Sequence, residues 1–254
     1  MRLPAAMDGT SLVQRLVAPG ETFEYRFTLL DAGTFWYHSH ANETVQVERG
    51  LYGALVVRGP DEPAFDAERV LVLDDEDVGA VIAIEGLPYR RSRMVWPRRT
   101  SWATLRVGPR APSRASLPAT LATIEPLVPP GPVTPTRTVR LGARMTLHGH
   151  DWLINGEAHH HDAPVKVGEL QVWDIVNDTG MDHPFHLHGC FFQVVAEGGV
   201  PTVPRAWEDT VNVVAKGRVT IAFRADDRPG AWMYHCHILE HHAAGMMGHF
   251  EVVR

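Results

Sequence analysis

The sequence predicts an all-β protein built as a sandwich of short strands. Apolar and β-branched residues recur in short segments with the length and period of strands, at 22–27, 54–57, 70–73, 170–176, 191–195 and 219–223. Turn signals such as Pro19-Gly20 and Pro229-Gly230 separate these segments. Sustained helical periodicity with caps is not found. Short strands divided by turns in this way favour a β-sandwich.

The composition limits the classes of function. The chain has 254 residues, of which 44% are hydrophobic and 21% charged, as is usual for a globular protein. A net charge of -6 argues against a nucleic-acid partner, which would require clustered basic residues. Apolar runs stay short of the about 18 residues that span a bilayer, so no membrane span is predicted. Residues 1–10 lack the basic and apolar regions of a signal peptide.

The chain divides into three parts. Eight prolines between positions 109 and 135 mark an extended connector rather than a sheet. We therefore expect a last domain at 139–254, and the region before it divides near Gly59-Pro60 into 1–59 and 60–138. The segments 33–40 and 230–237 both read Gly-x-x-x-Tyr-His-x-His, which indicates two related β domains.

Histidines are abundant, with 15 in the chain, and many fall in three short clusters. In the first, His38 and His40 would share one face of a strand and could bind one metal or two adjacent ones. By itself this pair is a weak signal, and a buried strand end is the competing explanation. In the second, His186 and His188 share a face. His183 precedes Pro184, which we expect to break the strand pairing and to let His183 aim elsewhere.

The third cluster combines a thiolate, an imidazole and a thioether in the spacing Cys-x4-His-x4-Met, at Cys236, His241 and Met246. With His183 as a second imidazole, this set is typical of a blue copper site for electron transfer. Zinc also binds cysteine and histidine, but structural zinc sites rarely use methionine. His235 and His237 flank Cys236 and would point to the opposite face of a strand, so that a short covalent route joins two metal sites. The other cysteine, Cys190, is expected to be a buried core thiol.

These clusters resemble those of the multicopper oxidases, the family of laccases and copper efflux oxidases, over most of the chain. The resemblance implies cupredoxin-like Greek-key β-sandwich domains. It implies a type 1 blue copper, a type 2 copper and a type 3 copper pair. Their ligands would be His183, Cys236, His241 and Met246 for type 1, His186 for type 2, and His38, His40, His188, His235 and His237 for type 3.

The resemblance also implies an activity. Phenols, aromatic amines or metal ions would lose single electrons at the type 1 copper, and O2 would be reduced to water at the trinuclear cluster. Cys236, His235 and His237 would link the two sites catalytically. Members of the family work mostly outside the cytoplasm, which predicts a periplasmic or secreted protein.

Two features depart from the family pattern. A His-x-His-Gly motif is expected before His38 and is not found, and the residues from Met1 to Gly9 resemble the segment directly after that motif in the family. We therefore expect 1–59 to be a partial N-terminal domain, 60–138 a contracted middle domain, and a homo-oligomer to be one way of completing the cluster. The spare histidines at 148–150 and 159–161 are expected at the surface.

The second departure concerns protons. Some bacterial relatives place a carboxylate directly after the type 1 histidine, and this position is His242 here. Glu240 and Asp209 are the expected substitutes as proton donors, with a structural role as the competing explanation. Two other functions stay open: a blue-copper electron-transfer module that does not reduce O2, and a gene fragment that does not fold stably as a monomer.

Overall fold

The computed structural model describes residues 1–60, 62, 70, 72, 123–147, 149–204 and 206–254. Two residues of the predicted strand at 70–73 and most of the predicted middle domain at 60–138 lie outside the described residues. Strands dominate the described part, and its helices are short: η1 (Ala5–Met7), α1 (Glu43–Gln46) and α2 (Leu239–Ala243). The predicted all-β class is therefore confirmed.

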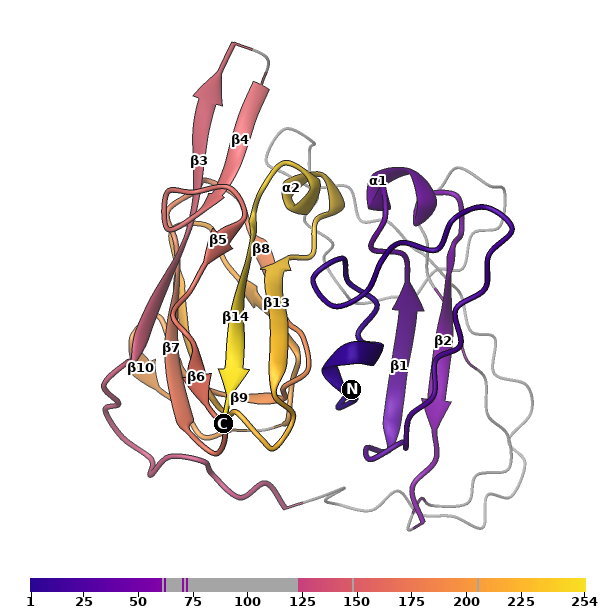
Figure 1. Cartoon of the computed structure of the whole chain (residues 1–254). Coiled ribbons are helices and arrows are strands. Elements are labelled where there is room, and N and C mark those ends of the chain that lie inside the picture. The colour runs from indigo at the N-terminus through magenta and orange to yellow at the C-terminus, as the bar shows by residue number, and fades with distance from the viewer. Residues whose placement is uncertain (61, 63–69, 71, 73–122, 148, 205) are drawn as a thin grey trace, which may run out of the picture.

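A sandwich of two sheets forms the C-terminal part of the chain (Figure 1). In spatial order, the first sheet contains β10 (Val200–Pro201), β9 (Phe192–Glu197), β12 (Arg218–Arg224), β7 (Leu170–Asn177), β3 (Arg137–Thr146) and β4 (Gly149–Ile154). The second contains β11 (Thr210–Val213), β8 (His183–Leu187), β13 (Gly230–Cys236), β14 (Met247–Val253) and β5 (His160–His161), with β6 (Val165–Lys166) also paired with β14. The first strand begins two residues before the predicted boundary at 139, and the division into domains stays a prediction.

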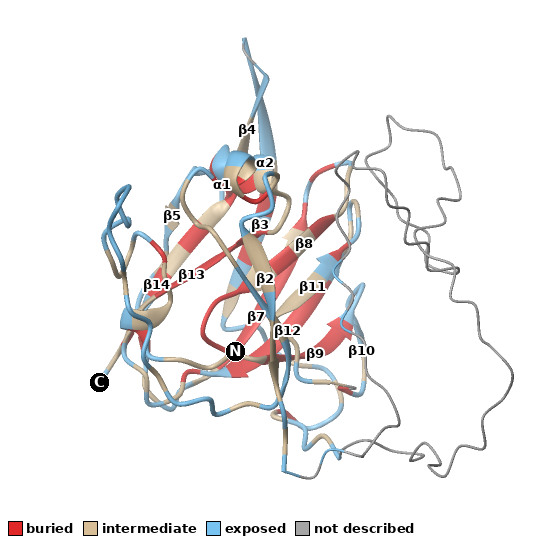
Figure 2. Cartoon of the chain, turned by 90° about the vertical axis from the view of Figure 1, so that its right-hand side faces the viewer, coloured by how far each residue is buried: buried red, intermediate tan, exposed pale blue. Residues whose placement is uncertain are grey.

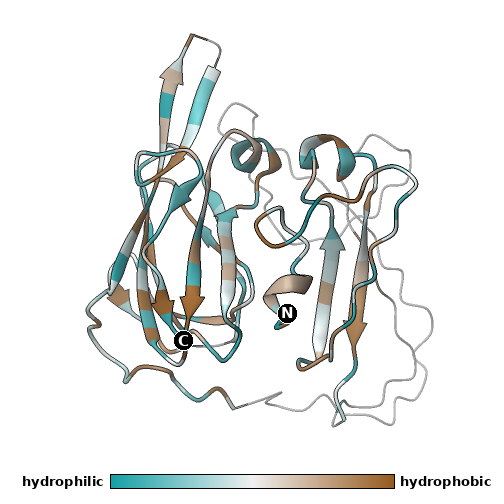
Figure 3. Cartoon of the chain, viewed as in Figure 1, coloured by the Kyte–Doolittle hydropathy of each residue, from teal (hydrophilic) through white to brown (hydrophobic). Residues whose placement is uncertain are grey.

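The core of the sandwich lies between these sheets (Figure 2). Hydrophobic and hydrophilic residues are mixed along its strands (Figure 3), and the buried hydrophobic residues of both sheets fill the core. Trp173 of the first sheet meets Tyr234 and Phe250 of the second edge-on, with ring centroids 5.2 and 5.3 Å apart. All three side chains are buried, and such contacts fix the distance between the sheets that carry the candidate site.

The N-terminal residues form a smaller element beside the sandwich (Figure 1). Strand β1 (Gly33–His38) pairs antiparallel with β2 (Tyr52–Val57), and α1 lies between them in the chain. The strand expected at 22–27 is not formed. Its residues alternate as a strand would, but they pair with no strand of the described chain and most are exposed. A segment with an alternating sequence forms a strand only where a neighbouring strand provides partners for its backbone hydrogen bonds.

Strands β8 and β13 are hydrogen-bonded neighbours in the register His186↔His235 and Phe185↔Cys236. The expectation that Pro184 breaks the strand is wrong, because Pro184 lies inside β8 and its carbonyl accepts a hydrogen bond from the His237 N–H (2.7 Å). Proline removes only a donor and keeps its acceptor. His183 therefore reaches the face opposite His186 through ordinary strand alternation.

Gly189, just after β8, packs closely against the ring of Trp232 on β13. Its φ is +69°, and a Cβ there would lie 2.2 Å from the Trp232 ring. We expect Gly189→Ala to lower the free energy of unfolding by about 1–3 kcal/mol through strain and overpacking. Gly180→Ala is the matched control, since nothing lies within 4 Å of its Cβ position. Equal urea midpoints for the two variants would contradict this packing.

Candidate metal centres

The first group of candidate ligands comprises His183 from β8, Cys236 from the end of β13 and His241 from α2. The Cys236 sulfur lies 3.4 Å from His183 Nδ1 and 3.6 Å from His241 Nδ1, and the two nitrogens are 3.2 Å apart. Ligands bonded at about 2.0–2.3 Å to one transition-metal ion have separations of this size. All three side chains are buried. The residues therefore fit a metal ion held by one thiolate and two imidazoles.

The surroundings prepare these side chains for a metal. Thr179 Oγ1 is 2.7 Å from His183 Nε2, which leaves Nδ1 to face the group. Burial lowers the pKa of His183 to about 4 and that of His241 to about 3, so both imidazoles are neutral near pH 7. Burial raises the pKa of Cys236 to about 12. The thiol therefore keeps its proton until a bound metal ion displaces it.

Met246 ends the loop that carries His241. Its N–H donates to the His241 carbonyl (2.9 Å), and its own carbonyl accepts from the Cys236 N–H (3.1 Å). These bonds close the loop on the end of β13, and Met246 is fully buried. Its backbone is thus held beside Cys236, and the role of its sulfur as axial ligand stays a proposal.

Trp152 on β4 covers this group. Its ring stacks on His241 with centroids 3.7 Å apart and meets His183 edge-on at 5.5 Å. Its backbone N–H donates to the Ala244 carbonyl (3.3 Å), which ties the β3–β4 hairpin to the loop after α2. No sequence signal indicates this role, because nothing in the pattern relates the hairpin to the third histidine cluster.

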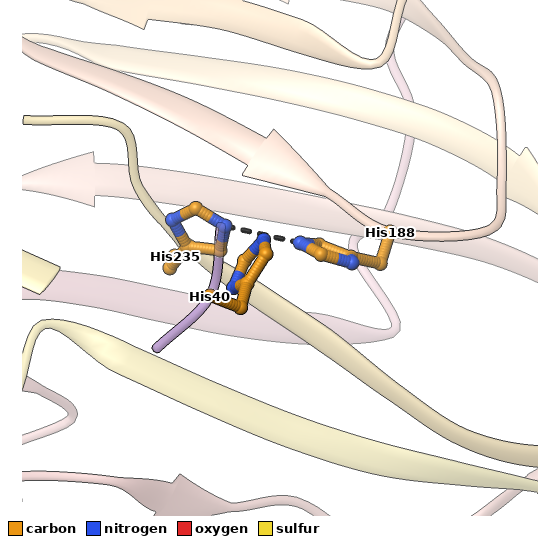
Figure 4. Close-up of side chains that lie close together, drawn as sticks. All are labelled: His40, His188 and His235. Atoms are coloured by element: carbon orange, nitrogen blue, oxygen red, sulfur yellow. Dashed lines mark hydrogen bonds between the residues drawn. The ribbon is translucent and has the colours of Figure 1, made fainter. Parts of the chain in front are cut away.

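The second group joins His40, His188 and His235 (Figure 4). The Nε2 atoms of His188 and His235 face each other at 3.1 Å. Each Nδ1 atom has an oxygen neighbour instead: the Cys236 carbonyl for His235 (2.9 Å), Asp8 for His188 (2.9 Å) and Glu43 for His40 (2.8 Å). Because these oxygens only accept, Nδ1 of His235 and His188 carries the proton and Nε2 offers its lone pair. Imidazoles that bind metals are usually held in this way.

The other three histidines of the predicted cluster adjoin this triad. The His237 ring lies 5.1 Å from His38 and 5.4 Å from His186, and the His186 ring lies 4.8 Å from that of His188. Burial lowers the pKa of His38 to about 3 and that of His237 to about 4, which keeps both available as ligands. The structure thus brings all six histidines predicted for the trinuclear cluster into one continuous group.

The prediction that His38 and His40 lie on one face of a strand is wrong. Strand β1 ends at His38, and His40 lies in the bend that comes after it. The two rings nevertheless approach to 4.8 Å, because the bend turns His40 toward the triad.

The two predicted proton donors lie in different surroundings. Asp209 is at the cluster: its carbonyl accepts from His186 Nδ1 (2.8 Å), and its carboxylate lies 3.8 Å from the same nitrogen. Glu240 is exposed on α2, and no hydrogen bond or ion pair joins its side chain to the described part of the cluster.

Two buried carboxylates were not predicted. Asp8 pairs with His188, and Glu43 lies between His40 and His242. Burial by itself would raise the pKa of both carboxyls, but the adjacent imidazoles lower it overall, so both are ionised. The position of His242 was the one signal in the sequence, since a carboxylate was expected there.

The surplus histidines lie mainly at the surface. His150 and His159 are exposed, His161 stacks on His249 with centroids 4.3 Å apart, and His148 lies outside the described residues.

Comparison with known proteins identifies the family. Residues 1–62 and 130–254 match two family models, each described as multicopper oxidase. The chain belongs to the multicopper oxidase family. Membership implies copper as the cofactor and an oxidase as the class of enzyme, in agreement with the ligand types in both groups.

Individual relatives agree. The multicopper oxidase MmcO of Mycobacterium tuberculosis is 26% identical over 94% of this chain and 73% of its own length. A laccase of Haloferax volcanii is 34% identical over 46% of this chain, and a multicopper oxidase of Staphylococcus epidermidis 36% over 39%. This chain spans only 22% and 24% of the length of these last two proteins. A multi-copper oxidase structure from Pseudomonas thermotolerans has a TM-score of 0.76 over 100% of this chain and 84% of its own, at 22% identity, and supports the fold.

The two cysteines allow a matched test of the first group. Cys236→Ser removes the proposed thiolate ligand, and we expect copper-loaded protein to lose its intense visible absorption. Cys190→Ser should keep that absorption, although Cys190 is also buried and its pKa is also raised to about 12. Absorption spectra after copper loading provide the measurement. A blue Cys236→Ser variant would overturn the assignment of the thiolate.

Proposed function

We propose that the protein is a laccase-like, copper-dependent oxidase. Phenols, aromatic amines or metal ions would lose one electron at the first group, and O2 would be reduced to water at the histidine cluster. One observation carries the proposal: Cys236 belongs to the first group, while its neighbours in the chain, His235 and His237, belong to the histidine cluster. The two groups thus lie on opposite faces of one strand end, joined by covalent bonds.

The chain supplies distinct ligand sets to its proposed sites. In this proposal the type 1 site uses His183, Cys236, His241 and Met246, the type 2 site His186, and the type 3 pair His38, His40, His188, His235 and His237. Bound copper supplies reversible one-electron chemistry between Cu(II) and Cu(I). His183, His235 and Cys236 are almost completely buried, which excludes water from them and keeps the two imidazoles neutral by lowering their pKa values.

Asp209 has the better position of the two proton donors predicted. Its carboxylate is 34% exposed and lies beside His186, so it connects the cluster with solvent. The ionised Asp8, by contrast, accepts the Nδ1 proton of His188 and so fixes that ring. We assign proton supply to Asp209 and orientation of His188 to Asp8.

The electron donor would approach the first group near Trp152. Its ring is half-buried and covers the imidazole of His241, so a small donor meets the tryptophan before the ligand. A periplasmic or secreted location stays a prediction from the family. No described helix has the length and apolar character needed to cross a bilayer.

An electron-transfer module without O2 reduction is the second candidate. The described chain contributes six imidazoles to the cluster, of which three form the compact triad of His40, His188 and His235. A module of this kind would take up copper firmly at the first group alone. The number of tightly bound copper ions per chain therefore separates the two proposals.

Oxygen uptake decides between them. We expect the copper-loaded chain to consume O2 when a phenolic donor is added, and to stop when a chelator removes the copper. The oligomeric state of the same sample, measured by light scattering, shows whether activity requires more than one copy. A blue protein without donor-dependent uptake would support the electron-transfer module.

Met246 provides a test of the axial position. We expect Met246→Leu to raise the reduction potential of the blue site, because the axial ligand is a lever on that potential. Leucine has nearly the same volume as methionine, so the buried loop should keep its packing. Potentiometric titration of the visible band measures the change. An unchanged or lower potential would exclude Met246 as a ligand.

A further inference from the structure

Glu43 is a buried carboxylate beside the triad that none of the proposed copper sites uses. It is 5% exposed and is the first residue of α1. One carboxylate oxygen accepts a hydrogen bond from His242 Nδ1 (2.6 Å), and the other lies 2.8 Å from His40 Nδ1. The second contact is short but is not aligned as a hydrogen bond. Burial of a charge is costly unless it is paired, and here two imidazoles from different parts of the chain provide the pairing.

His242 extends this contact to a second member of the triad. Its ring stacks on that of His235, with centroids 4.3 Å apart and an interplanar angle of 21°. His242 is 6% exposed and lies on α2, next to the candidate ligand His241. Glu43 therefore touches His40 directly and reaches His235 through His242.

The spacing of these atoms distinguishes a support from a further metal site. The ligand atoms of the first group lie 3.2 to 3.6 Å apart, and the facing nitrogens of His188 and His235 lie 3.1 Å apart, as ligands of a shared ion do. The Glu43 oxygens lie only 2.6 and 2.8 Å from the two imidazole nitrogens, which are the separations of charge-assisted pairs. A metal ion between them would force these atoms apart. The geometry thus favours direct pairing.

The pair also joins two regions of the fold. Helices α1 and α2 lie against each other (Figure 1), and Glu43 and His242 are separated by 199 residues in the chain. His40 comes from the N-terminal region, whereas His188 and His235 come from the sandwich. A contact across this boundary controls where His40 stands relative to the other two rings.

We propose that Glu43 and His242 are positioning residues for the site formed by His40, His188 and His235. Glu43 orients His40 so that its Nε2 faces the other two imidazoles, and His242 fixes the plane of His235. The inference rests on the proposed function, because it assumes that the triad holds copper. Supporting carboxylates of this kind typically change metal affinity about 10–100-fold when they are replaced.

The test compares Glu43→Gln with Glu240→Gln in the full chain. Glutamine keeps the size of Glu43 but loses its charge, and Glu240 is an exposed carboxylate on α2 that serves as the control. Titration of the metal-free protein with Cu(II) separates the blue site, seen by its colour, from cluster copper, counted as the total bound copper less the copper of the blue site. We expect Glu43→Gln to weaken the cluster copper about 10–100-fold with the blue band unchanged, and Glu240→Gln to resemble wild type.

His242→Phe gives a second measurement should Glu43→Gln fail to fold. Phenylalanine can stack on His235 but cannot donate to Glu43, so cluster affinity should fall while the blue site is kept. The exchanged pair, Glu43→His with His242→Glu, should recover part of the loss seen in either single variant. A general loss of packing would not be recovered by this exchange.

Two results would overturn the proposal. If the cluster binds copper with wild-type affinity in both Glu43→Gln and His242→Phe, the pair does not position His40 and His235. Anomalous scattering from copper bonded to the Glu43 carboxylate would make it a ligand instead. A variant that loses the blue band together with the cluster copper has a defect in its fold. A wild-type protein that binds no cluster copper would contradict the proposed function on which the inference rests.

Discussion

The candidate site depends on the alternation of side chains along two paired strands, β8 and β13. In their register, Cys236 stands opposite Phe185 and His235 opposite His186, so the two faces receive different ligands. The inner face takes the thiolate and His183 into the sandwich core, and the outer face turns His186 and His235 toward the N-terminal region. A slip of one residue would exchange these faces and abolish both groups. The aromatic core around Trp173 prevents such a slip.

The sequence predicted the parts of this arrangement that strand periodicity controls. The all-β class and the opposite directions of Cys236 and its neighbours result from spacing and alternation, whereas the meeting of the three histidine clusters was implied by the resemblance to multicopper oxidases. The error at Pro184 arose because the proline was treated as a break, although its carbonyl still bonds His237. The bend at His40 and the absence of a strand at 22–27 depend on contacts between distant segments, which periodicity does not contain.

The supporting residues were harder to foresee than the ligands. Ligands occur in dense motifs, whereas Asp8, Glu43 and Trp152 are single residues whose role comes from the residue they face in the fold. In the sequence, His242 stood out only because it occupies a position where a carboxylate was expected. In the structure, the carboxylate of Glu43 on α1 pairs with His242. Burial lowers the pKa of His235 and so keeps this imidazole neutral, while the Asp8 carboxylate accepts from the outer nitrogen of His188.

The contacts of the triad span most of the chain, and this affects how the metal sites come into being. Asp8 and His188 are 180 residues apart, and Glu43 and His242 are 199 apart, whereas Cys236 and His241 belong to one short loop. Bringing remote segments together carries a loop-closure entropy that local contacts avoid. The group of His183, Cys236 and His241 can therefore form as soon as the sandwich folds. The triad forms only after the N-terminal region has docked on the sandwich. If both groups bind copper as proposed, copper uptake by the triad would report complete folding, and uptake by His183, Cys236 and His241 would report folding of the sandwich alone.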